Sequence, residues 1–204
     1  MLNAGEILLH ANMHSQFVFF PINSVASVVR TLREGMCIEL ALIGNEGMVG
    51  LDVFMDAKTQ LDDVVVHSTG WAYRLPADEL RRQFRRGGSL QKYLLRFTDA
   101  LLAQVAQSAI CGRYHSPEAR LARWLLMIRD RTSSSEIHAT PIAMRTMLAV
   151  EPDRVVDSVK WLVGERLIVL RQDTITVTDR EGLEVNACEC YETMRQEYTR
   201  TLAS

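Results

Sequence analysis

The residues best suited to specific polar recognition lie in one short segment, residues 148–162. If the valines of this segment face a core, a turn of 100° per residue places Asp153, Asp157 and Lys160 at the centre of the opposite face. A lysine can pair with a phosphate, whereas a carboxylate can only accept a hydrogen bond, for example from a base amino group. The segment therefore predicts an exposed helix face that is partly acidic.

Cysteines and histidines are the residues that could hold a metal ion. The cysteines are Cys37, Cys111, Cys188 and Cys190, and none forms a C-x-x-C pair. Cys188 and Cys190 stand close together but lack a second pair of ligands, and the five histidines show no ligand spacing. We therefore expect reduced thiols rather than a disulfide framework, with no metal and no cofactor.

Composition and motifs exclude several classes of protein. No paired carboxylates, Ser/His/Asp order or phosphate-binding loop rises above chance, so we do not expect an enzyme. The chain has 204 residues, 48% hydrophobic and 24% charged, which is typical of a soluble globular protein. No apolar run reaches the roughly 18 residues of a membrane span, and the start does not resemble a signal peptide, so we expect a cytoplasmic location without membrane contact. The net charge of −2 argues weakly against a nucleic-acid partner, although a local basic patch would suffice.

Short β-rich runs occupy the first third of the chain. Pro21, Gly35 and Gly44-Asn45 separate them, and many short strands with turn signals suggest a sandwich or barrel. The runs cover residues 17–20, 24–29, 37–43, 64–66 and 71–75.

Helical patterns follow. One helix begins at Pro76 and is broken at Gly87-Gly88, after which Ser89 is the expected N-cap of a long helix ending near Arg113. The apolar stripe of the long helix fits core packing within one chain and a two-helix dimer seam equally well. In the dimer, the contact residues would be Leu90, Leu94, Phe97, Leu101, Val105 and Ser108.

The last part of the chain predicts a winged helix-turn-helix. After a helix that begins with Ser116 as its cap, Thr140 caps a short helix, residues 149–151 form a turn, and Pro152 opens the next helix. A hairpin over residues 167–178 follows at once, and this order favours nucleic-acid binding over an ordinary small α+β domain. The buried stripe of the second helix would be Val155, Val159 and Leu162.

The order of these parts resembles the Crp/Fnr family of bacterial transcription regulators over nearly the whole chain. The segment IELALIGNEGMVGL resembles the middle of that family's β-roll, CGRYHSPEARLARWLLMIRDR its hinge and first DNA-binding helix, and RLIVLRQDTITVTDREGLE its wing. The resemblance implies an α+β chain with a β-roll sensor (a cupin-like jelly roll) over residues 1–88, a dimerisation helix over 89–113 and a winged helix-turn-helix domain over 114–204. By the family's measure the chain starts late, since Met1 falls just before AGEILL.

The resemblance also implies partners and a signal. We expect a homodimer that binds double-stranded DNA, an effector of unknown identity in the β-roll, and RNA polymerase as a further candidate partner. Members that bind cyclic nucleotides use a Gly-Glu step and a downstream Arg-Ser or Arg-Thr, where this chain has Gly50-Leu51 and Leu61-Asp62-Asp63. Because an acid beside a phosphate is unfavourable, we expect neither cyclic AMP nor cyclic GMP to bind. No cysteine precedes Cys37 to hold an iron–sulfur cluster, and the turn at residues 45–50 is more simply interpreted as β-roll structure with glycines at positive φ.

The resemblance assigns DNA contacts to the two helices and the wing. Arg145 stands where the helices usually pack through a small residue, so its side chain must reach solvent or force the helices apart. Two acids among the contacts predict weaker and more salt-sensitive DNA binding than is usual. The alternative function is a regulator-derived dimer that binds protein instead of DNA. Phosphate contacts fall to Thr140, Arg145, Arg154, Lys160 and Arg171, and base reading falls to Asp153 and Asp157.

Overall fold

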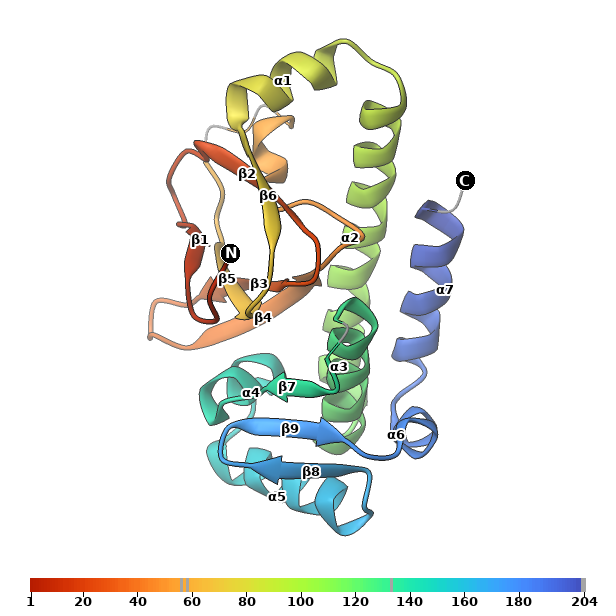
Figure 1. The fold of residues 1–204 in the computed structure, drawn as a ribbon. Helices are drawn as coiled ribbons and strands as arrows, with labels where there is room; N and C mark the ends of the chain where they lie inside the picture. The colour runs from red at the N-terminus through yellow and green to blue at the C-terminus, as the bar shows by residue number, and fades with distance from the viewer. Residues whose placement is uncertain (56, 58, 133, 203–204) are drawn as a thin grey trace.

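The computed structural model describes residues 1–55, 57, 59–132 and 134–202. An N-terminal β-roll lies beside a long helix, α2, and a winged-helix unit lies below the roll (Figure 1). This is the α+β architecture that the sequence predicts.

The β-roll combines a four-stranded antiparallel sheet in the order β1-β5-β3-β4 with the pair β2-β6. Every predicted run is a strand, while β1 was not predicted because three residues are too few to show an alternation. Side chains on β4 alternate, so Ala41 and Ile43 face the interior of the roll while Leu42 packs on the winged-helix unit. The strands are β1 Ile7–Leu9, β2 Phe17–Pro21, β3 Val25–Thr31, β4 Cys37–Ile43, β5 Asp63–Ser68 and β6 Ala72–Pro76, with a 3-10 turn at Leu51–Val53.

The turn over residues 44–50 packs the roll against its helices. A Cβ on Gly47 would lie 2.1 Å from the ring of Phe97, and one on Gly44 would lie 2.7 Å from Arg131. Only Gly50, with φ +103°, has the positive φ that we expected of these glycines. The other two are required by close packing, so the turn contributes to packing within the molecule.

Helices make up most of the rest of the chain. Ser116 and Thr140 cap α3 and α4 as predicted, because each side chain accepts a hydrogen bond from the backbone N–H three residues later. Ser89 does not cap α2: the N-cap is Gly88, whose φ of +89° turns the chain into the helix. The helices are α1 Ala77–Arg85, α2 Ser89–Tyr114, α3 Pro117–Arg131, α4 Pro141–Leu148, α5 Pro152–Gly164, α6 Arg180–Asn186 and α7 Cys190–Leu202.

The apolar stripe of α2 packs within its own chain. Leu94, Phe97 and Leu101 belong to the core of the roll, and Gln104, also fully buried, bonds both the backbone of Leu42 and the hydroxyl of Tyr198. These side chains have no surface left for a second copy, which corrects the contact residues predicted for a dimer. The other three, Leu90, Val105 and Ser108, are half-buried on the same inward side.

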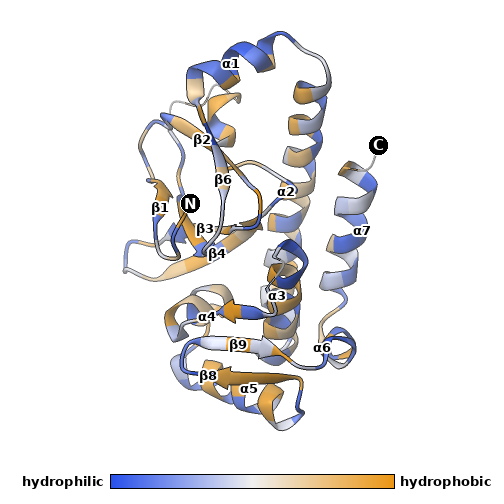
Figure 2. Cartoon of the chain, viewed as in Figure 1, coloured by the Kyte–Doolittle hydropathy of each residue, from blue (hydrophilic) through white to orange (hydrophobic). Residues whose placement is uncertain are grey.

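The C-terminal helix α7 runs antiparallel to α2 and packs along it (Figure 1). Tyr198 and Leu202 pack against the core cluster of the roll. The C-terminal end of the segment predicted as the DNA-binding domain therefore packs against the β-roll and α2. In Figure 2 the residues of α7 are coloured mostly hydrophilic, as expected of a helix with only one face against α2.

Candidate nucleic-acid interface

The helix-turn-helix is assembled from α4, a tight turn and α5. Ala149 adopts φ +50° at the end of α4, which lets the chain reverse into Pro152 at the first position of α5. Val155, Val159 and Leu162 are buried in a shared core with α3, as predicted from their spacing.

Charged side chains alternate in sign across the exposed surface of this unit. Asp153, Arg154, Asp157 and Lys160 on α5 are all exposed. Between residues 141 and 178 the chain carries five basic and five acidic residues, so the surface has no net charge to attract a phosphate backbone. The basic residues are Arg145, Arg154, Lys160, Arg166 and Arg171, and the acidic residues are Glu151, Asp153, Asp157, Glu165 and Asp173.

Two predicted contact residues lie on α4. Arg145 is exposed, so it reaches solvent rather than forcing the helices apart. Thr140 is half-buried, and its hydroxyl accepts a hydrogen bond from the Ala143 N–H while the residue faces a cavity between α4 and the roll that Glu39 and His67 also line. Thr140 is therefore less accessible than the exposed α5 residues.

The wing is a three-stranded sheet in the order β7-β9-β8. β8 Ile168–Arg171 and β9 Thr174–Val177 form the predicted hairpin, and Gln172 adopts φ +52° in its turn. Arg171 lies exposed beside that turn. β7 Glu136–His138 was not predicted, because its single buried residue, Ile137, gives no alternation.

Several apolar side chains are also exposed on the helix pair. Ile142 is 77% exposed, and Val156, Trp161 and Val163 on α5 are each exposed as well. Apolar groups of this kind suit contact with a protein or with thymine methyl groups better than contact with phosphate.

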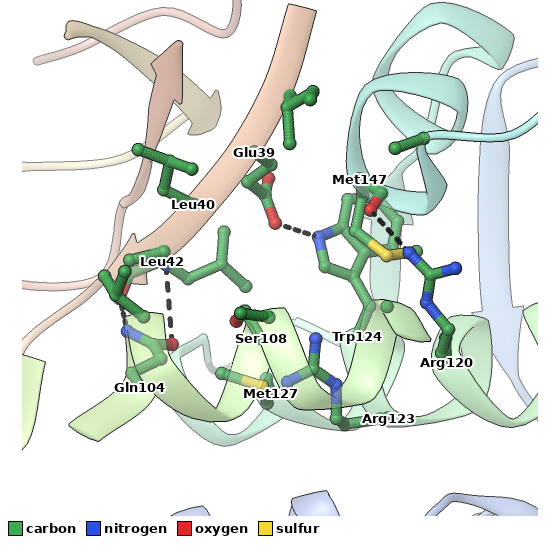
Figure 3. A pocket seen from close by; sticks show the side chains of 16 residues that line it. Glu39, Leu40, Leu42, Gln104, Ser108, Arg120, Arg123, Trp124, Met127 and Met147 are labelled. Carbon is green, nitrogen blue, oxygen red and sulfur yellow. Dashed lines mark hydrogen bonds between the residues drawn. The ribbon is translucent and has the colours of Figure 1, made fainter. Parts of the chain in front are cut away.

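A cavity of about 300 Å³ lies between β4, α2 and α3, where the roll meets the winged-helix unit (Figure 3). The indole of Trp124 donates to Glu39 at 2.8 Å, Ser27 donates to the same carboxylate at 2.7 Å, and the Arg123 side chain reaches up between α2 and α3. Burial raises the pKa of Glu39 to about 7, against the opposing effect of these donors. The buried ring of His67 packs edge-on to Trp124, and desolvation lowers its pKa to about 4.

The interior of the roll is packed with apolar side chains from both sheets and α2. Leu51 is part of that packing, and Asp62 pairs with Arg30 on the neighbouring strand. The positions at which cyclic-nucleotide-binding members hold their ligand are thus occupied by a core residue and by a paired acid. No helix of the described residues has the length and apolar character needed to cross a membrane.

Comparison with known proteins identifies the fold. No family model and no curated protein matches the sequence. Solved structures do match: a CRP-family transcriptional regulator from Thermus thermophilus has a TM-score of 0.74 at 16% identity, covering 91% of this chain and 95% of its own. FixK2 from Bradyrhizobium japonicum gives 0.75 at 12% identity, covering 92% and 95%. A putative crp/fnr regulator from Eubacterium rectale gives 0.71 at 16% identity, covering 91% and 87%.

These likenesses extend over nine-tenths of the chain and confirm the predicted resemblance at the level of fold. The chain therefore has the Crp/Fnr regulator fold. At such low identity the fold alone is established, and function depends on the residues described above.

Proposed function

We propose that the protein is a DNA-binding transcription regulator of the Crp/Fnr type, with phosphate contacts from Arg154, Lys160 and Arg171. The observation that carries the proposal is the orientation of α5: its apolar stripe packs on α3, so its charged face is open to solvent as a recognition helix requires. Arg145 and Thr140 would add backbone contacts from α4, and Asp153 and Asp157 would accept from cytosine amino groups.

The test is binding to duplex DNA over a range of salt concentrations, followed by fluorescence anisotropy. A chain with few phosphate contacts should bind at low salt. The logarithm of the binding constant should then fall with the logarithm of the salt concentration, with a slope of about −0.9 per phosphate contact. The paired change Arg154→Ala with Lys160→Ala should weaken binding and flatten the slope by about two contacts, whereas Arg82→Ala on the distant helix α1 should change neither. Absence of binding at low salt, or a slope near zero, would contradict a regulator.

The second candidate is a dimeric module that binds a protein through the same surface. The balanced charges and the exposed apolar residues Ile142 and Trp161 favour it. Salt-dependent DNA binding separates the two functions, because a module that binds only protein makes no phosphate contacts.

The effector of such a regulator would bind between the domains rather than inside the packed roll. An occupant of the cavity beside Glu39 would touch β4, α2 and α3 at once, so binding there could change how the winged-helix unit sits on the roll. Neither cyclic AMP nor cyclic GMP should change the melting temperature, and a rise with either would contradict this location.

A dimer would form along the exposed side of α2. Leu95, Leu102 and Ala109 are exposed and recur every seven residues, the period of a two-helix seam. They replace the inward-facing residues as the proposed contacts with a second copy.

A further inference from the structure

Four potential metal ligands from distant parts of the sequence meet at the end of α2. Cys111 and His115 stand one helical turn apart, while Cys188 precedes α7 and Cys190 begins it. One ligand atom from each residue lies within 4.8 Å of all the others. The sulfurs of Cys111 and Cys188 are 3.4 Å apart, and so are the sulfur of Cys190 and Nδ1 of His115.

The surroundings hold these atoms in an orientation suited to a metal. All three sulfurs belong to buried residues. His115 turns Nδ1 towards Cys190 while its Nε2 lies 3.1 Å from a carboxylate oxygen of Glu189, an arrangement that leaves the Nδ1 lone pair free to ligate. Gln107 donates an N–H to the Cys190 sulfur at 3.0 Å, a contact that stabilises a thiolate.

Charge at the site also favours a cation. The guanidinium of Arg123 lies close enough to Cys111 and Cys188 to act on both electrostatically. Three sulfurs this close together cannot all be thiolates without a cation among them, because like charges repel. Nε and Nη1 of Arg123 are buried without a hydrogen-bond partner among the described residues, so its charge can offset the net negative charge of a metal bound by three thiolates.

We propose that Cys111, His115, Cys188 and Cys190 bind one Zn²⁺ ion in a tetrahedral site. With Zn–S bonds of about 2.3 Å, sulfurs in such a site lie roughly 3.8 Å apart, so the side chains need to move by only about 1 Å or less. Three sulfurs and an imidazole suit zinc, whereas an iron–sulfur cluster would need its ligands spread around several irons. A Cys111–Cys188 disulfide is the other chemistry open to this geometry, and it would leave Cys190 and His115 without a role.

The ion would fasten two parts of the chain at the point where the fold divides. Cys111 and His115 lie where α2 passes into α3, and Cys188 and Cys190 lie where the winged-helix unit passes into α7. Zinc would thus fix α7 along α2. The sequence alone does not predict the site, because Cys111 and Cys188 are 77 residues apart. The Cys-x-x-x-His spacing of Cys111 and His115, one turn apart at the end of α2, is the local signal that points to it.

The first experiment uses the full-length wild-type protein purified under reducing conditions. Native mass spectrometry and elemental analysis should find one zinc per chain, released in proportion when a mercurial reagent titrates the thiols. Replacement by Co²⁺ should give thiolate-to-cobalt charge transfer and the strong d–d absorption of a tetrahedral site. Removal of zinc should speed hydrogen exchange in α7 more than in the strands of the roll.

Matched variants locate the ion. Cys188→Ser and Cys190→Ser should each lower zinc affinity by at least about tenfold, while Cys37→Ser, which removes an exposed cysteine of the roll, should retain one zinc per chain. Four outcomes would overturn the proposal: no zinc in the reduced wild-type protein, zinc that survives Cys188→Ser unchanged, an iron–sulfur chromophore, or a Cys111–Cys188 disulfide that forms equally with excess zinc. The wild-type measurements decide the question even if a variant fails to fold.

Discussion

The winged-helix unit has one face against the β-roll and another open to solvent, and the two faces are built differently. Towards the roll, α3 is almost entirely buried, and Trp124 and Arg131 bond partners on β4 and in the turn after it. Towards solvent, α5 carries charges of both signs and exposed apolar groups. A buried contact tolerates little change, whereas an exposed charge can change at small cost in stability. This difference explains how a chain with 12% and 16% identity to two of its structural neighbours can share their fold while its exposed side chains are free to vary.

The largest expected effect comes from the buried ion pair between the two parts of the molecule. Nε of Arg131 donates to Glu46 at 2.7 Å, and both side chains are largely buried. Arg131→Ala should lower the free energy of unfolding by about 3 kcal/mol, because it leaves the Glu46 carboxylate buried without its cation. Urea denaturation measures the loss.

Two controls test the origin of that loss. The double variant Arg131→Met with Glu46→Gln should recover most of the stability, since no charge is then stranded. Arg145→Ala, at an exposed arginine of α4, should change stability by about 0.5 kcal/mol or less. Equal losses from Arg131→Ala and Arg145→Ala would show that the two faces do not differ as described.

A smaller effect is expected at the outer side of α2. Leu102 is 63% exposed, and Leu102→Glu should weaken the proposed dimer by roughly 100-fold, because it places like charges in an apolar seam. Light scattering over a dilution series should show monomers. Tyr73→Glu, at an exposed residue of β6, is the matched control, and an unchanged mass for Leu102→Glu would move the seam elsewhere. Phe97→Glu cannot serve this purpose, since Phe97 is fully buried in the core.

Substitutions on the exposed face of α5 should change DNA binding rather than stability. Asp153→Arg with Asp157→Arg should strengthen binding to random duplex DNA by roughly tenfold or more and steepen the log–log salt slope by about two. The matched control, Asp78→Arg with Glu181→Arg, changes the net charge equally on α1 and α6. If both pairs strengthen binding equally, total charge rather than the α5 face governs affinity.

The features that the sequence predicted correctly are those that depend on the spacing and type of neighbouring residues. The stripe of Val155, Val159 and Leu162, the caps at Ser116 and Thr140, and the hairpin at residues 167–178 all follow from short-range rules. The sequence does not show what an apolar helix stripe packs against. The stripe of α2 fits a core and a dimer equally well, and only the tertiary structure shows that the β-roll covers it.

Features that depend on distant segments were missed for the same reason. The cavity beside Glu39 and the Cys111–His115–Cys188–Cys190 cluster each need residues brought together by the fold. Burial of Glu39 had no local signal, since a glutamate within a β-rich run is usually an exposed residue.

The smallest effect expected is the pH dependence of stability that arises from Glu39 and His67, where the β-roll meets the winged-helix unit. The pKa of Glu39 is raised from 4.5 to about 7 in the folded protein, so its contribution to stability is complete below pH 4.5 and is lost as the pH rises through 7. The pKa of His67 is lowered from 6.5 to about 4, so its contribution is present above pH 6.5 and is lost as the pH falls through 4. Between pH 4.5 and 6.5 the two groups therefore oppose each other, and the wild-type protein should show little pH dependence from this region.

Glu39→Gln should separate the two groups. Without the carboxylate, His67 acts alone, and the melting temperature should fall as the pH is lowered from 6.5 to 4 more steeply than in the wild type. At pH 8 the same variant should melt higher, by roughly 2–4 °C if the relief of desolvation is on the order of 1 kcal/mol. His67→Gln should give the opposite profile, with stability falling as the pH rises from 4.5 to 7. Calorimetric profiles of Glu39→Gln and the wild type that run parallel over this range would mean that Glu39 is already ionised and solvated in the folded protein.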